Sequence, residues 1–490
     1  MTTFISSVDR GALAVQKALA SWWCFGVILG VFALGSTWLA ITGADHFLYD
    51  EDYHFGIVQV YTHQWLPFIH QGNRFEGLGD IGRTGSYLYH YLVSFPVRLV
   101  EAFGGNDRAQ LVSARLCSVV FFSASFVWFR LLLRELGASR ALTNVALAVF
   151  AAIPIASAVA ATVNYDSLTI LFTAIFLWQA VRIWKAPDLR FPELLLLAAV
   201  GCFGSLTKYT FLPVFAATAV LLAIVLIVRA CRGQTKFTWG YGTWRFFAWG
   251  AAALIGVGLF VERYVVNLIV YRSLQPDCGK LHPVSFCLTY GPWARNYTLA
   301  EQFVGAAPTP GRVVYFFFQQ WIPGLLWSSR YVGTNTHATI GAASTATIID
   351  VGVALGAFLI VVGIGWLLAR RGMVVPFVAV LAYMIALFAV NLGDFDKTDQ
   401  PIGVQGRYLL PLAPILIAAA GMVLARFFDS MYLRAAIAKV LVVVAIAIAM
   451  TQGGGVLTYF AAASDDWYAV TGWPMRVNHA LTWIANKLLI

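Results

Sequence analysis

The chain has 490 residues, of which 60% are apolar and only 11% are charged, and its formal net charge is +10 at pH 7. A water-soluble domain of this length, with a mean hydropathy of +0.75, would aggregate, so the composition excludes soluble enzymes and soluble binding proteins. The sequence therefore predicts an all-α polytopic membrane protein that forms a single transmembrane domain over residues 1–490.

Apolar runs long enough to cross a hydrocarbon core of about 30 Å recur along the chain. The first run is too long, and lacks the small-x-small exit site, for a cleaved secretory signal, so we expect it to remain as an anchor. In chain order we expect about eleven transmembrane helices, at residues 22–42, 111–131, 141–161, 167–182, 192–207, 211–228, 246–267, 348–369, 373–391, 408–425 and 440–460.

The distribution of Lys and Arg predicts the orientation, because basic residues in short loops are retained on the cytoplasmic side. With the N-terminus inside, the short inner connections hold 17 of the 33 basic residues but only five acidic residues. Membrane topology therefore explains the basic balance, and no nucleic-acid partner is needed. The same orientation predicts that residues 43–110 and 268–347 form long extracytoplasmic loops.

Both long loops contain aromatic-rich stretches that are too polar or too short to span a membrane, such as GIVQVYTHQWLPFIH in the first and RVVYFFFQQWIPGLLW in the second. These stretches indicate helices lying in the membrane interface, and packed loop helices without a catalytic part are the alternative. Cys278 and Cys287 lie nine residues apart in the second loop. An oxidising compartment favours a disulfide between them over two free thiols.

Polar residues that are not positive-inside anchors gather at the ends of the predicted spans. Under the predicted topology all of them face outward, whereas random loop polarity would divide between the two faces. Their convergence indicates one site at the outer boundary of the membrane. The candidates are Asp50, Glu51, Asp52 and His54 after the first span, Arg115, Asn164 and Asp166, Lys208 with Tyr209, and Gln405, Arg407 and Tyr408.

The residue types at these positions indicate a reaction. A carboxylate can take a proton from a hydroxyl group. Lys and Arg can hold a phosphate, and Arg can do so through two parallel hydrogen bonds. A base and phosphate-binding cations at a lipid interface together predict attack on a lipid-bound phosphate ester.

The motif Asp50-Glu51-x-x-His54-Phe55 resembles the acidic first-loop motif of the GT-C superfamily, the integral-membrane glycosyltransferases that use polyprenyl- or dolichyl-phosphate sugars. Protein O-mannosyltransferases carry D-E-x-H-F-G there, so this chain departs from that branch by one residue. The longer spacing, with Asn164-x-Asp166, the Lys208 segment and Gln405-Gly406-Arg407-Tyr408, is similar to a bacterial branch found with surface-polysaccharide genes. The chain also resembles aminoarabinose transferase type enzymes of the same superfamily.

The resemblance implies a GT-C fold in the bacterial inner membrane and inverting transfer of a single sugar from a polyprenyl-phosphate donor to a glycan, lipid or protein acceptor. The first-loop aspartate is the base in that superfamily, which implies Asp50, with Glu51 and Asp52 as rivals. Glu51 alternatively binds a hydroxyl of the acceptor or the sugar. If the segment is helical, His54 shares a face with Asp50 and orients the base or contacts the phosphate.

Each candidate also has a simpler structural explanation. Asp52 is alternatively a solvated loop residue, Asp166 a helix cap with Asn164, Lys208 and Arg407 interface anchors, and Arg115 a partner of Asp107. A divalent metal at the carboxylate and His54 cluster is compatible with the residue types but not favoured, because lipid-monophosphate donors already carry a good leaving group. No cofactor is expected to be required.

Two other functions compete with the transferase. A transporter or flippase of lipid-linked sugars places ionisable groups or broken helices near the membrane midplane, whereas these predicted spans are almost uncharged at their centres. A structural assembly subunit without activity leaves the acidic cluster unexplained. The partners expected from the sequence are thus the lipid bilayer, a polyprenyl-phosphate-linked sugar and an acceptor.

Overall fold

The computed structural model describes residues 13–45, 50–68, 77–234, 236–240, 242–303, 309–329, 331–333, 338–340, 343–429 and 455–488, with the side chains of 331–346, 348 and 429 excepted. Within these residues helices dominate. The strands there form two small pairs, β1 (Leu189–Arg190) parallel to β2 (Phe237–Thr238), and β3 (Tyr331–Gly333) antiparallel to β4 (Ala338–Ile340). The expected all-α fold class is confirmed.

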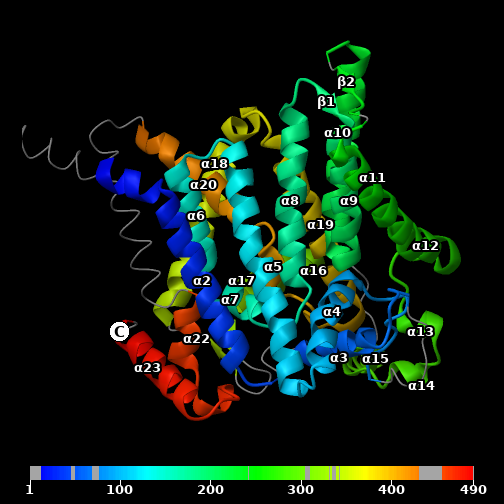
Figure 1. Cartoon of the computed structure of the whole chain (residues 1–490), viewed down its shortest axis with the longest axis vertical. Coiled ribbons are helices and arrows are strands. Elements are labelled where there is room, and N and C mark those ends of the chain that lie inside the picture. The colour runs from blue at the N-terminus through cyan, green and yellow to red at the C-terminus, as the bar shows by residue number, and fades with distance from the viewer. Residues whose placement is uncertain are drawn as a thin grey trace, which may run out of the picture.

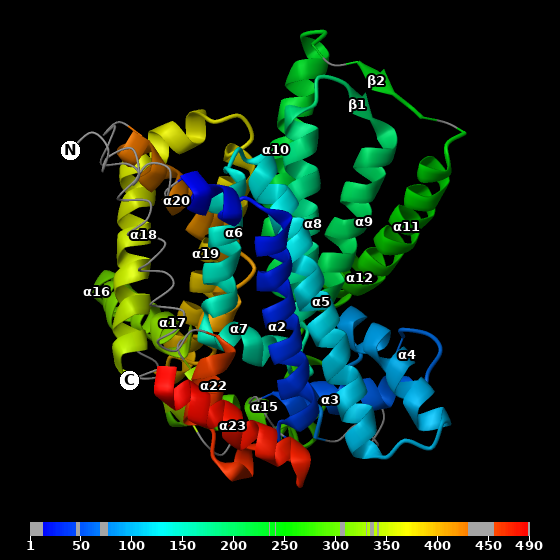
Figure 2. The same ribbon diagram turned by 60° about the vertical axis from the view of Figure 1, so that its left-hand side comes forward.

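Among the described residues, seven helical segments are long and apolar enough to cross a membrane. Figures 1 and 2 show the long helices running side by side along the vertical axis. The seven are α2 (Trp22–Thr42), α5 (Asp107–Glu135), α8 (Asp166–Lys185), η2 (Tyr209–Phe211) with α10 (Leu212–Cys231), α11 (Trp244–Phe260) with η3 (Val261–Val265) and α12 (Val266–Tyr271), residues Ile349–Ala369 of α18 (Ala343–Ala369), and α19 (Val374–Thr398).

The expected count of eleven spans is not confirmed. The run 141–161 forms two helices, α6 (Arg140–Ala152) and α7 (Pro154–Ala160), which meet at 76°. Ile153 between them is extended, because the residue before a proline is disfavoured in the helical region. Two further apolar helices, α9 (Phe191–Thr207) and α20 (Ala413–Asp429), are shorter than the other spans, and most of the expected span 440–460 lies outside the described residues.

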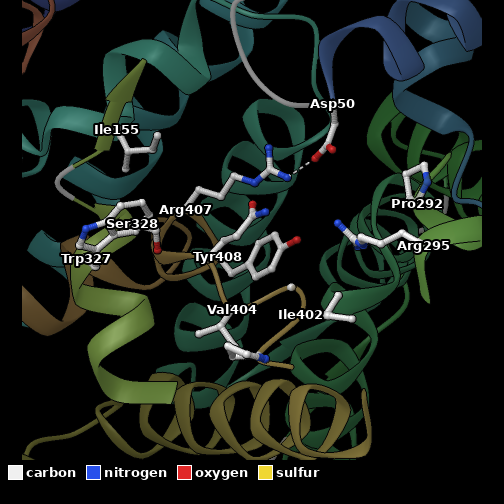
Figure 3. A pocket seen from close by; sticks show the side chains of 13 residues that line it. Asp50, Ile155, Pro292, Arg295, Trp327, Ser328, Ile402, Val404, Arg407 and Tyr408 are labelled. Carbon is white, nitrogen blue, oxygen red and sulfur yellow. Dashed lines mark hydrogen bonds and ion pairs between the residues drawn. The ribbon is translucent and has the colours of Figure 1, made fainter. Parts of the chain in front are cut away.

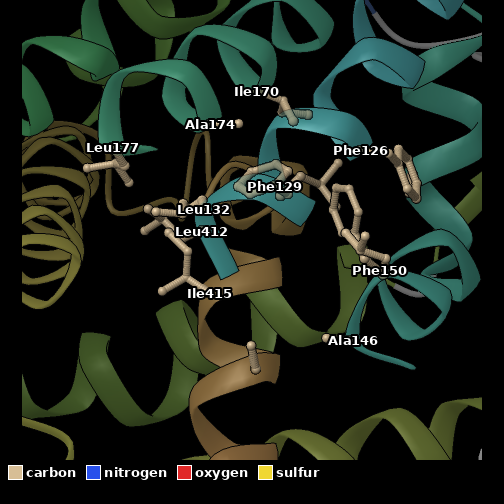
Figure 4. Packing of buried hydrophobic residues seen from close by; sticks show 14 of the residues in the cluster. Phe126, Phe129, Leu132, Ala146, Phe150, Ile170, Ala174, Leu177, Leu412 and Ile415 are labelled. Carbon is tan, nitrogen blue, oxygen red and sulfur yellow. The ribbon is translucent and has the colours of Figure 1, made fainter. Parts of the chain in front are cut away.

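Buried aromatic rings hold the long helices together. Phe122 and Phe126 of α5 lie with their ring centroids 5.5 and 5.3 Å from that of Phe150 in α6. Figure 4 shows Phe126, Phe129 and Phe150 in one layer of packed side chains. Because protein interiors are close-packed, this layer fixes α5 and α6 against each other and thereby fixes the ends of both helices.

The two long loops contain helices, as expected. In the first loop these are α3 (Glu51–Thr62) and α4 (Leu88–Ala102). In the second they are α13 (Cys278–Leu281), α14 (Val284–Cys287), α15 (Gly291–Gln302), α16 (Pro310–Tyr315), η4 (Phe316–Trp321) and α17 (Ile322–Ser329). Figures 1 and 2 show α3, α4 and α15 together at one end of the bundle. The described C-terminal part adds α22 (Val456–Ala462), η6 (Asp465–Trp467) and α23 (Trp473–Leu488) at the same end.

The predicted disulfide is present between Cys278 and Cys287, whose sulfur atoms are 2.03 Å apart. It closes a loop of the second outer segment. Thr289, just after that loop, accepts a hydrogen bond from the backbone N–H of Gly77, at 3.0 Å, so the second outer segment is joined directly to the first.

Candidate active site

A buried ion pair fixes the acidic segment that follows α2. Glu51 accepts two hydrogen bonds from Arg115 of α5, at 2.8 and 2.6 Å, and its carboxylate also accepts one from the N–H of Val163. Arg115 donates further to the carbonyls of Gly43 and Ala44, at 2.9 and 2.7 Å. The end of α2, the start of α3, and the chain just before α8 are therefore tied to α5.

Asp50 occupies the N-cap position of α3, yet its side chain makes no capping hydrogen bond. Its carboxylate instead forms an ion pair with Arg407. Arg407 lies in η5 (Gly406–Leu409), and Gly406 lets this turn approach α17 closely: a Cβ atom at Gly406 would lie 2.4 Å from the carbonyl oxygen of Leu325. The glycine therefore allows Arg407 to reach Asp50.

Asp166, at the first position of α8, holds two cations. Lys208 forms an ion pair with one of its carboxylate oxygens, and the Nε of Arg407 lies 3.6 Å from the other. The Lys208 ammonium also lies over the rings of Tyr408 and Tyr165, at 4.1 and 4.7 Å from their centroids. Four charges thus alternate in sign, from Lys208 through Asp166 and Arg407 to Asp50.

Burial of the Lys208 ammonium lowers its pKa, and the neighbouring charge of Arg407 lowers it further, whereas Asp166 opposes both effects. Asn164 lies beside this cluster, and its side-chain oxygen accepts a hydrogen bond from the N–H of Asp166, at 2.6 Å. Asn164 therefore satisfies a free N–H at the start of α8, while the Asp166 carboxylate is used for the cations.

A cavity of about 480 Å³ opens beside the ion pair of Asp50 and Arg407. Figure 3 shows Asp50, Arg407, Tyr408 and Arg295 around it, with Ile155, Trp327, Val404 and Ile402 on other sides. One part of the wall is polar and another apolar. The lining residues are Asp50, Ile155, Pro292, Arg295, Trp327, Ser328, Pro401, Ile402, Gly403, Val404, Gln405, Arg407 and Tyr408.

The three adjacent acids have different environments. The side chain of Asp50 is 38% exposed and lines the cavity. The side chain of Glu51 is 1% exposed and is held by Arg115. Asp52 is exposed in the first turn of α3 and does not line the cavity. Of the three, only Asp50 is placed to meet a molecule in the cavity.

His54 is buried one helical turn after Asp50, and its Nδ1 lies 2.9 Å from Nε2 of His90 in α4. Its ring also packs edge-on against Tyr165, with centroids 4.5 Å apart. Burial lowers the pKa of His54 well below its ordinary value, and His90, Arg407 and Lys208 lower it further. Burial lowers the pKa of His90 to about 3. Both imidazoles are therefore neutral at pH 7, and the cavity wall includes neither of them.

The structure brings most of the sequence-predicted residues together and corrects two of the simpler explanations. Arg115 pairs with Glu51, so the alternative pairing with Asp107 is wrong. Lys208 is only 3% exposed and ion-paired, which does not fit an interface anchor. Gln405 and Tyr408 line the cavity, whereas Tyr209 lies outside its lining.

Some residues at this site carry no signal in the sequence. Arg295 and Trp327 line the cavity from α15 and α17, and His90 partners His54 from α4. The aromatic character of their loops was visible in the sequence, but nothing there placed these particular residues beside Asp50. Within the described part of the chain, no three or more His, Cys, Asp or Glu side chains gather in a way that could hold a metal ion.

Comparison with protein families gives a match to "Predicted membrane protein (DUF2142)" over residues 76–416. The chain belongs to this family. The part of this DUF2142 protein that matches includes Asp166, Lys208, Arg295 and Arg407, whereas the segment from Asp50 to His54 precedes it. A search of curated proteins found no significant match.

Solved structures similar to this DUF2142 protein include ArnT from Cupriavidus metallidurans bound to undecaprenyl phosphate, with 14% identity and a TM-score of 0.45, covering 96% of this chain and 70% of that one. They also include the oligosaccharyltransferase AglB from Archaeoglobus fulgidus in complex with an inhibitory peptide and a dolichol-phosphate, with 12% identity and a TM-score of 0.44, covering 94% of this chain and 59% of that one.

These neighbours are GT-C glycosyltransferases, the superfamily that the first-loop motif resembles. The chain spans less than two thirds of the length of AglB. At TM-scores below 0.5 the likeness assigns no activity to this chain, so its chemistry rests on the site described above.

Proposed function

We propose that this protein transfers a single sugar from a polyprenyl-phosphate donor to a hydroxyl of a glycan, lipid or protein acceptor, with inversion and with Asp50 as the general base. The observation that carries the proposal is the position of Asp50. Its partly exposed carboxylate lines the cavity and is paired with a buried arginine, whereas Glu51 is held by Arg115 and Asp52 does not line the cavity.

The proposed reaction balances through Asp50. Its carboxylate takes the proton of the acceptor hydroxyl, and the acceptor oxygen forms a bond to the anomeric carbon from the face opposite the phosphate. The bond from the anomeric carbon to the phosphate oxygen breaks, and its electron pair stays on the phosphate. The products are the glycosylated acceptor and the polyprenyl phosphate.

Arg407 links the base to the donor in this proposal. Its planar guanidinium can bind a carboxylate or a phosphate through the same hydrogen-bond donors. A phosphate that enters the cavity therefore competes with Asp50 for Arg407. Binding of the donor weakens the ion pair and leaves the Asp50 carboxylate available to accept the proton of the acceptor.

The composition of the cavity wall supports a lipid-linked substrate. Polar groups on Asp50, Arg407 and Gln405 line one part, and the apolar side chains of Ile155 and Val404 line another. A volume of about 480 Å³ falls in the range of small-molecule sites, which are mostly apolar with a few fixed polar groups. A sugar phosphate attached to an apolar chain has this same division between polar and apolar parts.

The placement of the charges argues against the competing transporter. Transporters bind their substrates near the membrane midplane, at broken helices or buried ionisable groups. Here the charged cluster lies where α8 begins, beyond the last residue of α9, and at the turn before α20. By the distribution of basic residues, we assign this end of the helices to the extracytoplasmic side of a bacterial inner membrane.

The experiment compares Asp50→Asn with Asp52→Asn in purified protein reconstituted in lipid. Undecaprenyl-phosphate-linked sugars and a cell-envelope extract from a strain lacking the gene are supplied, and mass spectrometry follows the release of undecaprenyl phosphate. Asp50→Asn is expected to lower transfer by roughly 10²–10⁴-fold while donor binding is kept, the scale for a lost general base.

Asp52→Asn serves as the matched control, because it removes the same charge two residues away, from a side chain that does not line the cavity. It is expected to keep turnover within a few-fold of the parent protein. Near-normal transfer by Asp50→Asn, or an equal loss in Asp52→Asn, would overturn the assignment of the base. No transfer by the parent protein with any donor of this class would overturn the proposed reaction.

A further inference from the structure

Arg295 differs from the other cations near the cavity in having no carboxylate partner among the described residues. Arg407 is shared by Asp50 and Asp166, and Lys208 is held by Asp166. Arg295 donates from Nε and Nη2 to the side-chain oxygen of its neighbour Asn296, at 3.1 and 2.9 Å. A guanidinium carries five N–H donors, so this contact leaves both its charge and other donors available.

The side chain of Arg295 faces the cavity. It lines the wall from α15, and Figure 3 shows its guanidinium directed toward the ring of Tyr408, with Arg407 and Asp50 beyond. An anion in the cavity would therefore meet one cation that is already neutralised, Arg407, and one that is not. Electrostatics favours the uncompensated charge as the first contact, because binding there breaks no existing ion pair.

Several contacts hold α15 at this place. Trp293, in its first turn, donates its indole N–H to the carboxylate of Asp277, at 3.1 and 3.2 Å from its two oxygens. Tyr290, the residue before α15, stacks on Tyr53 of α3, with ring centroids 5.0 Å apart. The residue before the helix that carries Arg295 is thus packed on the helix that begins directly after Asp50.

Two contacts hold the loop before α15. The Cys278–Cys287 disulfide closes it, and His282 contacts the carboxylate of Asp80 in the first outer segment, at 3.2 Å. Asp80 in turn accepts hydrogen bonds from the backbone N–H groups of Arg83 and Thr84, at 2.8 and 2.7 Å. These contacts hold the start of α15, which carries Arg295, against the first outer segment.

We propose that Arg295 receives the phosphate of the lipid-linked donor and, with Arg407, holds it on opposite sides of the cavity. This inference rests on the proposed function and names a donor-binding residue for it. Arg295 makes the first contact, the phosphate then competes with Asp50 for Arg407, and the two guanidinium groups share the phosphate oxygens. The ligand class is a phosphate ester with an apolar chain.

The experiment measures binding of undecaprenyl phosphate to the full chain in lipid nanodiscs, by native mass spectrometry and by competition. Arg295→Ala is expected to weaken binding by roughly 10–100-fold, as for a lost charge-assisted hydrogen bond. Arg295→Lys keeps the charge but loses the planar fork, so it is expected to recover part of the affinity. Lys280→Ala, which removes an exposed cation from the disulfide loop away from the cavity, is expected to bind like the parent protein.

The other possible outcomes contradict the role of Arg295, the ligand class or the donor class, as follows. If Arg295→Ala binds like the parent protein, the role of Arg295 is wrong while the proposed reaction stands. If inorganic phosphate at millimolar concentration displaces the lipid completely, the site is one for free phosphate and the lipid-linked class is wrong. If the parent protein binds no undecaprenyl phosphate, both the inference and the donor class of the proposed function fail. An unchanged thermal unfolding temperature of Arg295→Ala confirms that a loss of binding is not a loss of folding.

Discussion

Glu51 and Arg115 form a doubly hydrogen-bonded ion pair in which both side chains are almost completely buried. The two residues are 64 positions apart, and Arg115 also binds carbonyls at the end of α2. Asp50, which immediately precedes Glu51, is therefore held in place by its own neighbour. Glu51 therefore stabilises the position of the proposed base and does not itself line the cavity.

The first prediction concerns this ion pair. Arg115→Met leaves the carboxylate of Glu51 buried without its partner and is expected to lower the free energy of unfolding by about 3–5 kcal/mol. The double variant Glu51→Gln, Arg115→Met removes both charges and is expected to regain part of that loss. Thermal unfolding of the detergent-solubilised protein measures both effects. Glu51→Gln with unchanged stability but lost turnover would place Glu51 in the chemistry instead.

The second prediction concerns the planar guanidinium group of Arg407. Arg407→Ala removes the group that pairs with Asp50 and is proposed to hold the phosphate, so both donor affinity and turnover are expected to fall. Arg407→Lys keeps the charge without the planar fork and is expected to recover only part of the activity. Donor affinity and turnover measured separately for the two variants test this. Parent-like values in Arg407→Ala would remove Arg407 from the site.

The third prediction concerns the buried pair of Lys208 and Asp166. Lys208→Met leaves Asp166 with only the more distant Arg407, and Asp166→Asn leaves Lys208 without its carboxylate partner. Because residues in one charged network are coupled, the double variant is expected to be more stable than the sum of the single losses predicts, by about 0.5–3 kcal/mol. Additive losses in a double-mutant cycle would show that the two residues act independently.

The fourth prediction concerns pH and the buried histidines. Burial lowers the pKa of His90 to about 3 and also lowers that of His54, whereas both titrate near 6.5 in the unfolded chain. Between those values the unfolded state binds more protons, so stability is expected to fall as pH falls below about 6.5. The slope is about 1.4 kcal/mol per pH unit for each imidazole.

Thermal unfolding between pH 7.5 and pH 5 measures this dependence. His90→Gln keeps a hydrogen-bonding side chain that does not titrate, and it is expected to flatten the dependence of the unfolding temperature on pH. An identical slope in the parent protein and in His90→Gln would show that His90 does not contribute.

The helical fold class could be predicted because long apolar runs indicate membrane-spanning helices. The residues that converge at one end could be predicted because polar side chains are costly close to the membrane interior. Ten of the expected spans coincide with described helices, although the run 141–161 is broken in two. The break could be predicted from Pro154, because a proline disfavours the helical conformation of the residue before it. The angle of 76° between the two helices depends on tertiary packing and could not be predicted from the local sequence.

The roles within the site were less predictable. Three adjacent acids at positions 50–52 are equivalent in sequence, and only the distant partners Arg115 and Arg407 distinguish them. Arg295 lies in a loop whose place depends on a disulfide, a stacked tyrosine pair and an Asp80 contact. The tyrosine pair and the Asp80 contact join segments more than 200 residues apart, so local spacing cannot reveal them.

The alternation of two cations and two carboxylates from Lys208 to Asp50 has a consequence for charge conservation during transfer. These four groups sum to zero, and Arg295 adds one positive charge, which matches the single negative charge of a phosphodiester donor. The departing monoester gains a second negative charge when the sugar leaves. In the proposed reaction Asp50 gains the proton of the acceptor in the same step, so the total charge of the site would stay constant. Transfer would then require no ion to enter or leave the site before the product is released. The proton on Asp50 can leave with the phosphate of the released polyprenyl phosphate.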